Sequence, residues 1–351
     1  MTPCCQLIQR NLDLFENENW AVVNPDDSNV FSISDSFKCG LHQDYRSYSS
    51  SLSFQTTKQC FAAQWQTTDL ISDVNGFVIF MPKVKQLLPL ILLNLLNITT
   101  TLTKYVVVGE NAGGAKSAKS IMEEQLSNVT KIDSARRCSL FFGMSDEVGN
   151  KTPIPVIKKE SITHDQTTLT VCSMPGVFGN KKVDPGTRIL LEHLPTDLNP
   201  KSIRRGYDFA CGSGILGAYL SILYPSLSMT YSDVSALAIY STEQTLKENQ
   251  LEGEVKPCDG FLPADKKLDI IVSNPPFHNH LQNDYNITKT FINNAHKHLN
   301  RGGAIYLVAN SFLPYKECLK EVFGEFEIPY NDNKYAVYVA HKFSVSDEKT
   351  V

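Results

Sequence analysis

The segment Ser273-Asn274-Pro275-Pro276-Phe277 carries side chains suited to chemistry on an aromatic amine. The nitrogen of such an amine is a poor nucleophile because its lone pair is delocalised into the ring. The side-chain oxygen of Asn274 and the carbonyl of Pro275 would hold the two amine hydrogens and direct the lone pair at an incoming methyl group. Pro275 and Pro276 would stiffen the loop, and Phe277 would stack on an extruded base. A strand that merely ends in a Pro-Pro turn is the structural alternative.

A glycine-rich segment, Asp208 to Gly217, reads DFACGSGILG and contains the pattern G-x-G-x-x-G. Glycines let the backbone approach a ligand closely, and the start of a helix offers unpaired N–H groups. Asp233, 19 residues after Gly214, would hold the two ribose hydroxyls of an adenosine. Asp259 would accept from an adenine amine or serve as a turn residue beside Gly260. S-adenosylmethionine and a nicotinamide dinucleotide both fit this pattern, and so does a turn without a ligand.

Four histidines form two H-x-H pairs, His278 with His280 and His296 with His298. Residues two apart on a helix do not share a face, and no cysteine lies near enough to complete a zinc site. The nine cysteines are scattered without a C-x-x-C pair. We therefore expect no metal and no disulfide framework.

The C-terminal half alternates strand-like and helix-like segments, which predicts an α/β fold with a mostly parallel sheet covered by helices. Two last strands, near residue 326 and over 335–341, are predicted to form an antiparallel hairpin. The other predicted elements are strands over 203–209, 228–232, 254–258, 268–273 and 304–309, and helices over 215–223, 235–250 and 287–299.

The N-terminal half repeats the end of this pattern. Residues 77–82 resemble residues 269–275, and they too are followed by an apolar helical stretch and a strand over 105–109. No glycine turn precedes residue 80, so this degenerate copy is predicted to bind no cofactor. We place a linker over Ser145–Gln166 and domains over residues 1–155 and 156–351.

Composition excludes several classes of protein. Of 351 residues, 42% are apolar and 20% charged, which is typical of a soluble globular chain. The net charge of −4 argues against a protein that coats nucleic acid by bulk electrostatics. Residues 131–205, however, carry twelve basic and eight acidic side chains, which indicates either a solvated surface or a phosphate-facing one.

The apolar run 87–98 is too short to cross a membrane. No signal peptide is evident, so we expect a cytoplasmic protein. We also expect it to be a monomer.

Several motifs resemble those of a known family. The glycine turn, Asp233 and the Asn-Pro-Pro-Phe loop are similar to class I S-adenosylmethionine-dependent methyltransferases that modify exocyclic amines. Three stretches resemble the two-domain bacterial rRNA guanine-N2-methyltransferases: Met174–Gly179, Asn274–His278 and Val308–Tyr315. Two stretches of the N-terminal half, Val108–Asn111 and Lys131–Cys138, are similar to the small-subunit RsmC family.

The resemblance implies two Rossmann-like methyltransferase domains. The C-terminal one would be active, with a seven-stranded, mostly parallel sheet ending in an antiparallel hairpin. The N-terminal one would be degenerate and serve RNA docking. The implied reaction is methylation of the N2 amine of guanine-1207 of 16S rRNA in the 30S subunit, with S-adenosyl-L-methionine as cofactor. The expected cofactor-binding residues are Asp208, Ala210, Gly212, Gly214, Asp233 and Asp259, and the expected base-amine site is Asn274, Pro275, Pro276 and Phe277.

The chain departs from the family pattern at Ala210, where the family usually has glycine. A methyl group there would crowd the cofactor unless the alanine adopts a negative φ. Residues 180–186 also depart from the pattern, so we assign no role within them.

Other functions remain open at this level. The same loop fits a 23S rRNA guanine, a DNA adenine or a protein glutamine as acceptor. The glycine turn also fits a nicotinamide-dependent dehydrogenase, and Ala210 is consistent with a catalytically dead rRNA-binding assembly factor.

Overall fold

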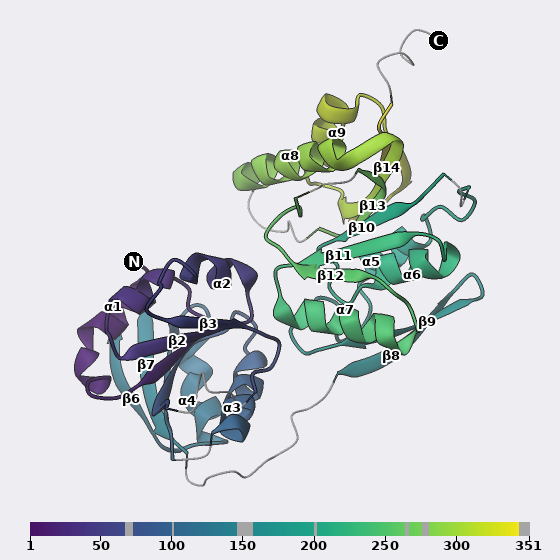
Figure 1. Cartoon of the computed structure of the whole chain (residues 1–351). Helices are drawn as coiled ribbons and strands as arrows, with labels where there is room; N and C mark the ends of the chain where they lie inside the picture. Colours follow the sequence, from purple (N-terminus) through teal and green to yellow (C-terminus); the bar gives the residue numbers. More distant parts are fainter. Residues whose placement is uncertain are drawn as a thin grey trace. The chain divides into compact units, whose positions relative to one another are not determined.

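The structure is a computed structural model. It describes residues 1–66, 73–99, 102–145, 157–199, 202–263, 267–275 and 281–343, with the backbone alone at 281–285 and 287. The chain forms two compact units, Met1–Val156 and Ile157–Val351 (Figure 1). Each unit contains its own seven-stranded sheet.

The second unit has the predicted mostly parallel sheet, with strand order β12-β11-β10-β13-β14-β16-β15. β16 runs antiparallel to both of its neighbours, so the predicted terminal hairpin is confirmed. The strands are β10 (Arg205–Phe209), β11 (Ser228–Asp233), β12 (Glu254–Pro257), β13 (Leu268–Ser273), β14 (Leu299–Asn310), β15 (Glu327–Asn331) and β16 (Tyr335–His341).

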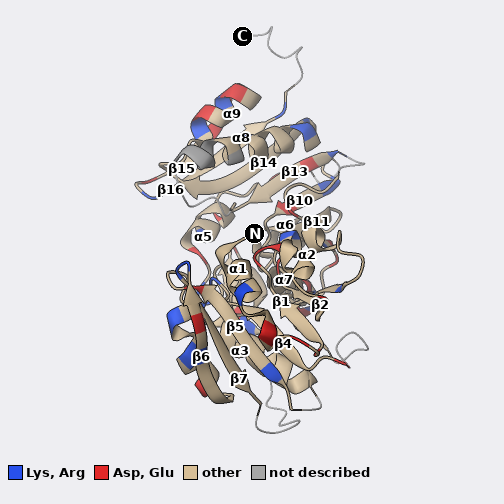
Figure 2. Ribbon diagram, turned by 90° about the vertical axis from the view of Figure 1, so that its left-hand side faces the viewer, with Lys and Arg blue, Asp and Glu red and all other residues tan. Residues whose placement is uncertain are grey.

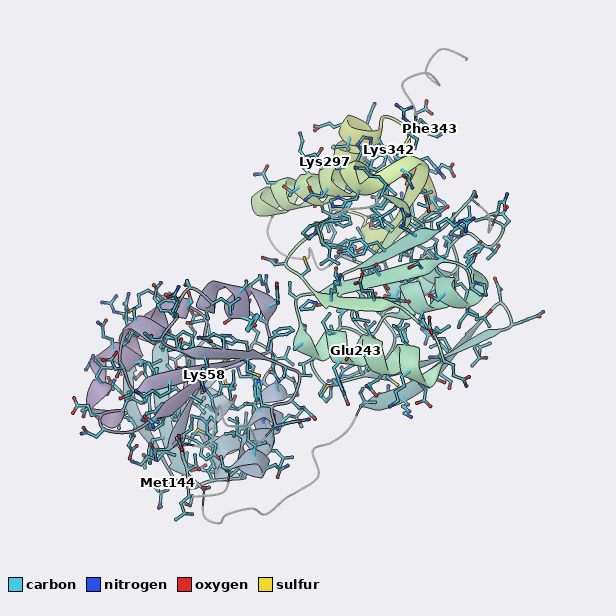
Figure 3. All side chains as sticks on the ribbon, in the orientation of Figure 1. Lys58, Met144, Glu243, Lys297, Lys342 and Phe343 are labelled. Carbon is cyan, nitrogen blue, oxygen red and sulfur yellow. The ribbon has the colours of Figure 1, made fainter. Side chains whose placement is uncertain are left out.

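Helices cover both faces of this sheet, which explains why the central strand β13 has consecutive apolar residues, Ile270 to Val272. Alternate residues of a strand point to opposite faces. On β13, Ile270 and Val272 join the buried cluster with α5, α6 and α7, whereas Ile271 joins the cluster with α8 and α9. The helices are α5 (Pro185–Leu191), α6 (Ile215–Leu223), α7 (Ala236–Glu248), α8 (Leu281–His298) and α9 (Tyr315–Phe323). Near the end of α8, the Lys342 amine donates to the carbonyls of His296 (2.7 Å) and Leu299 (3.0 Å) (Figure 3).

The first unit repeats this topology, as the sequence predicted. Its order β3-β2-β1-β4-β5-β7-β6 matches that of the second unit strand for strand. The strands are β1 (Trp20–Val23), β2 (Phe37–His42), β3 (Lys58–Phe61), β4 (Gly76–Phe80), β5 (Lys104–Glu110), β6 (Ser127–Ala135) and β7 (Cys138–Met144). The helices are α1 (Pro3–Arg10), α2 (Tyr45–Ser51), α3 (Leu87–Ile98) and α4 (Ala118–Glu123), with 3₁₀ turns over 12–14, 28–32 and 115–117. In the described part of the chain, no helix has both the length and the apolar character needed to cross a membrane.

The two units differ where the chain leaves the first strand of each sheet. After β1, Asn24 has a positive φ of 50°. Its side-chain oxygen accepts from the Gln43 N–H (2.7 Å), and its amide donates to the Gln43 side-chain oxygen (3.0 Å). A short 3₁₀ turn, Ser28–Ser32, follows where the second unit has a glycine turn and α6. Polar side chains therefore occupy this edge of the first sheet.

The linker prediction over Ser145–Gln166 is wrong for its last part. Lys158–His164 forms strand β8, which pairs with β9 (Thr167–Ser173) in an antiparallel hairpin. Asp165 and Gln166 both have positive φ, as a two-residue hairpin turn requires. The strand looked like a linker because only one of its side chains, Ile162, is buried. Residues 146–156 of the predicted linker lie outside the described residues.

The basic stretch over 131–205 is partly neutralised by carboxylates. The Lys158 amine lies 2.8 Å from Glu160 Oε2, and the Lys159 amine lies 2.6 Å from Glu248 Oε2. Lys and Arg alternate with Asp and Glu along the ribbons of both units (Figure 2). This part of the charge pattern favours a solvated surface over a continuous phosphate-binding one.

Candidate active site

Three strands of the second sheet bring the predicted motifs to one edge. In the sheet register, Phe209 of β10 lies opposite Ser232 of β11 and Ser273 of β13. The residues that follow, Ala210, Asp233 and Asn274, therefore leave the sheet side by side. The Ser273 hydroxyl donates to the Phe209 carbonyl (2.8 Å), which ties the ends of β10 and β13 together.

The glycine turn needs glycine at Gly214 for two reasons. Its φ is +73°, and a Cβ there would lie 2.8 Å from Cγ2 of the buried Thr242. Thr242 also fixes the turn, since its hydroxyl donates to the Gly212 carbonyl (3.1 Å). At Gly212, by contrast, a Cβ would meet nothing closer than Val177 Cγ1 at 4.0 Å. The turn is thus held tightly from α7 and has open space beside Gly212.

Asp233 lies beside this turn, at the carboxyl end of β11. One oxygen accepts from the Gly212 N–H (3.0 Å) and the other from the Ser235 N–H (2.9 Å). The Cys258 N–H donates to the Asp233 carbonyl (3.0 Å), which places the exposed Asp259 at the same edge. Two carboxylates therefore lie on the same side of the glycine turn, at the ends of β11 and β12.

Asp208 differs from these two acids because it is enclosed by the protein. It is only 1% exposed, and its Oδ2 accepts from the Gly217 N–H (2.9 Å). Burial raises the pKa of Asp208 to about 7; the Gly217 N–H opposes this rise, and the nearby charge of Asp233 adds to it. The carboxyl group fastens the start of α6 to β10.

Ala210 does not have the negative φ that would let an alanine fit without strain. Its φ is +55°. A side chain in this left-handed region costs roughly 1–2 kcal/mol, because Cβ approaches the following carbonyl oxygen. The residue is partly buried and packs against the hydrophobic cluster on the α8 side of the sheet.

Asn274 is half-buried, and its amide is held by residues just before and within α5. The amide nitrogen donates to Asp184 Oδ2 (3.1 Å) and to Thr187 Oγ1 (3.0 Å). Pro275 is buried beside it, and Pro276 and Phe277 lie outside the described residues. Asp184 lies within residues 180–186, where no functional residue was predicted from sequence. The available signal was an aspartate directly before a proline, which is typical of a helix start.

The described histidines of the H-x-H pairs make their contacts on the α8 side of the sheet. The His298 ring nitrogens lie near the carbonyls of Asn294 (2.6 Å) and Leu262 (3.1 Å), and the His296 ring packs on Phe323. His278 and His280 lie outside the described residues. Among the residues that the structure does describe, no group of three or more His, Cys, Asp or Glu side chains could hold a metal ion. Burial raises the pKa of the Cys211 thiol far above its usual value, so this thiol stays protonated.

Comparison with known proteins identifies the family. Residues 168–339 match the methyltransferase small domain, and residues 5–154 match the methyltransferase small domain N-terminal family. A ribosomal RNA small subunit methyltransferase C of Pseudoalteromonas atlantica is 32% identical over 351 residues, covering 97% of this chain and all of the relative. The enzyme of the same name from Vibrio cholerae is 35% identical over 353 residues, covering 97% and 99%. The chain belongs to the RsmC family.

A solved structure extends the match to the whole RsmC fold. The RsmC of T. thermophilus, described as a 16S rRNA N2 G1207 methyltransferase in complex with AdoMet and guanosine, has a TM-score of 0.81. It is 21% identical, and the match covers 97% of this chain and 92% of that one. The predicted arrangement of two Rossmann-like methyltransferase domains is confirmed.

Proposed function

We propose that this chain transfers a methyl group from S-adenosyl-L-methionine to the N2 amine of guanine-1207 of 16S rRNA within the 30S subunit. Its cofactor-binding site is built from Asp208, Ala210, Gly212, Gly214, Asp233 and Asp259, and its base-amine site from Asn274, Pro275, Pro276 and Phe277. The first unit is a docking platform for the RNA, and the enzyme acts as a cytoplasmic monomer.

One observation carries the proposal: the Asn274 loop and the glycine turn leave neighbouring strands at the same level of the sheet. Ligands of open α/β sheets bind at this carboxyl edge. The juxtaposition supports transfer between a ligand on the turn and an amine on the loop. Hydride transfer by a dehydrogenase would not explain an Asn-Pro-Pro loop at this position.

The residues around the turn fit an adenosine-bearing cofactor. The space beside Gly212 allows close backbone approach, and the Asp233 carboxylate at the end of β11 is an acceptor for ribose hydroxyls. The exposed Asp259 on the next strand is an acceptor for an adenine amine. Asp208 acts indirectly, by holding the first turn of α6 in place.

When bound, S-adenosyl-L-methionine supplies a methyl group on a sulfonium sulfur, which keeps the C–S bonding pair as the new N–C bond forms. The chain contributes orientation. Asn274 Oδ1 and the Pro275 carbonyl accept hydrogen bonds from the two N2–H groups. These hydrogen bonds turn the nitrogen lone pair toward the methyl carbon. Both acceptors also stabilise the positive charge that develops on nitrogen before it releases one proton to water.

Exposed aromatic side chains in loops of this unit favour an RNA substrate with unpaired bases. Phe178 is 55% exposed in the loop whose Val177 faces Gly212, and Phe312 is 66% exposed just after the carboxyl end of β14. Aromatic rings stack on unpaired bases and contribute about 1–3 kcal/mol per base.

The test is transfer of tritium from labelled S-adenosylmethionine to 30S subunits that lack the modification. Naked 16S rRNA, 50S subunits and DNA run alongside. We expect label on 30S that falls at least ~100-fold in Asn274→Ala, because one lost acceptor at a developing charge costs about that much. The control is Asn331→Ala, an exposed asparagine of β15. Label on 50S or DNA alone would refute the substrate, and binding of subunits without any transfer would indicate a dead assembly factor.

A further inference from the structure

The side chain of Asn274 is held at its nitrogen end. Both partners come from the start of α5, where Asp184 is the N-cap residue and Thr187 lies in the first turn. The distances from Asn274 Nδ2 are 3.1 Å to Asp184 Oδ2 and 3.0 Å to Thr187 Oγ1. An amide nitrogen has two hydrogens, so these two bonds use its full donor capacity.

The chemistry of Asp184 decides which way the Asn274 amide faces. An ionised carboxylate only accepts hydrogen bonds, so the amide nitrogen has to face it and the amide oxygen has to face away. Within the described residues, no donor of the chain is bonded to Asn274 Oδ1. The lone pairs of that oxygen therefore remain for a ligand.

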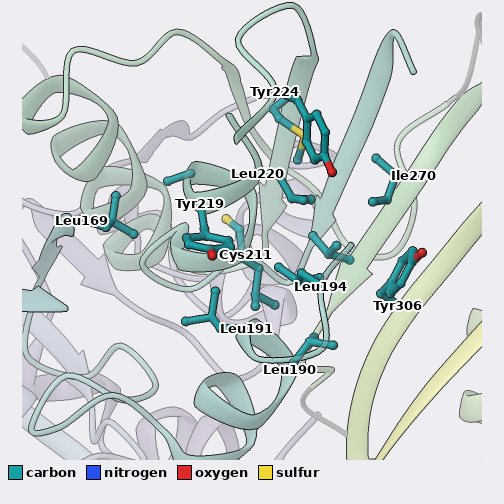
Figure 4. Close-up of a cluster of buried hydrophobic side chains, with 14 of the residues drawn as sticks. Leu169, Leu190, Leu191, Leu194, Cys211, Tyr219, Leu220, Tyr224, Ile270 and Tyr306 are labelled. Carbon is teal, nitrogen blue, oxygen red and sulfur yellow. The ribbon is translucent and has the colours of Figure 1, made fainter. Parts of the chain in front are cut away.

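The two partners sit on a rigid support. Leu190 and Leu191 of α5 are buried in the cluster that includes Cys211 and Tyr306 (Figure 4). Asp184 Oδ2 also accepts from the Thr187 N–H (3.1 Å), which fixes the first turn of the helix. A Cβ at Gly186 would lie 2.9 Å from Asp184 Oδ2 and 3.1 Å from Tyr335 Cε1, so glycine is needed for this close packing.

We propose that Asp184 and Thr187 are positioning residues, which orient the Asn274 amide so that Oδ1 accepts a hydrogen of the substrate amine. The nature of the substrate rests on the function proposed above, whereas the orientation of the amide does not. Without these partners the Asn274 amide can rotate by half a turn and present its NH₂ group to the substrate amine. Two N–H donors would then face each other, and no hydrogen bond could form between them. The effect falls on catalysis and leaves cofactor binding intact.

Matched substitutions separate positioning from folding. Thr187→Val keeps the shape of the buried side chain and removes the acceptor, whereas Thr187→Ser keeps the hydroxyl. Asp184→Ser keeps a good N-cap residue but is too short to reach Asn274. We expect Thr187→Val and Asp184→Ser to lower the methyl-transfer rate at saturating substrate at least tenfold, with unchanged binding of S-adenosylhomocysteine. Thr187→Ser should stay within about threefold of the wild type.

A double substitution shows whether Thr187 acts through Asn274. If it does, Thr187→Val added to Asn274→Ala lowers the rate no further. Multiplied losses, or weaker binding of S-adenosylhomocysteine by Thr187→Val, would overturn the proposal.

A second measurement does not depend on the substrate. In protein labelled with ¹⁵N-asparagine, the Asn274 side-chain amide, assigned by its loss in Asn274→Ala, should exchange slowly with water. The exchange should accelerate at least tenfold in Thr187→Val and Asp184→Ser and not in Thr187→Ser. Unchanged exchange would overturn the positioning role even if the wild type methylates RNA. Accelerated exchange in these two variants, together with a wild type that does not methylate RNA, would instead refute the proposed function alone.

Discussion

The buried carboxyl of Asp208 makes the stability of the second unit depend on pH. Its pKa is about 7 in the folded protein, against 3.8 for an unperturbed aspartate. A raised pKa means that the folded unit prefers the protonated acid. The contribution of Asp208 to the stability of the folded unit is therefore fully present below about pH 4 and is lost as the pH rises through 7. At about 1.4 kcal/mol per pKa unit, a shift of roughly three units corresponds to about 4 kcal/mol.

Asp208→Asn removes this titration and keeps an oxygen that accepts from the Gly217 N–H. The stability of the variant relative to wild type, measured as the difference in their free energies of unfolding, should therefore increase by about 4 kcal/mol between pH 4 and pH 8. Groups that titrate in both proteins cancel in this difference.

The assay is urea unfolding at several pH values, followed by hydrogen exchange in peptides from β10 and α6. These peptides report on unfolding of the second unit. Tryptophan fluorescence would report on the first unit instead, because Trp20 and Trp65 both lie there. Asp259→Asn, at an exposed carboxylate, serves as the control. A stability difference between Asp208→Asn and wild type that stays constant from pH 4 to pH 8 would refute the reasoning.

Three further predictions concern the turn and its surroundings. Ala210→Gly should stabilise the second unit by about 0.5–1 kcal/mol in urea unfolding, because relief of the left-handed strain exceeds the extra entropy of an unfolded glycine; a loss above 1 kcal/mol would contradict this. Gly214→Ala should cost at least about 2 kcal/mol from its positive φ and its contact with Thr242. Adding Thr242→Ser, which removes Cγ2, should recover part of that loss, and no recovery would count against the steric explanation. Phe312→Ala should weaken binding of 30S subunits about tenfold in filter assays without changing S-adenosylhomocysteine affinity, and equal loss of both would point to misfolding.

Strand β13, which is buried on both faces, was predictable from sequence, whereas the largely exposed strand β8 was not. The limits of β13 (268–273) were predicted residue for residue, because a central parallel strand has a nearly continuous run of apolar residues. Strand β8 was missed because a two-stranded hairpin buries little, and its lysines and threonines resemble a linker. The sequence signal for a strand thus depends on how many of its faces are buried.

The site shows the same division between local and distant information. The turn and the Asn274 loop were predicted because each is a short motif at the end of a strand. The contact between Asp184 and Asn274 spans 90 residues, and no local pattern specifies it. The conformation of Ala210 was also missed, because alanine usually has a negative φ, and only the sheet around it imposes a positive one.

The first unit provides an internal control for Ala210. Asn24 follows β1 as Ala210 follows β10, and the two have nearly the same positive φ, 50° and 55°. Both strands occupy the same place in their sheets. The left-handed exit is therefore a property of the topology, which this chain tolerates twice without glycine. The carboxyl edges of the two sheets differ in what surrounds this exit. In the first unit the Asn24 side chain is hydrogen-bonded to Gln43, whereas in the second unit there is open space beside Gly212. Because the same left-handed conformation occurs in both units, the positive φ of Ala210 does not by itself distinguish an active enzyme from a dead one.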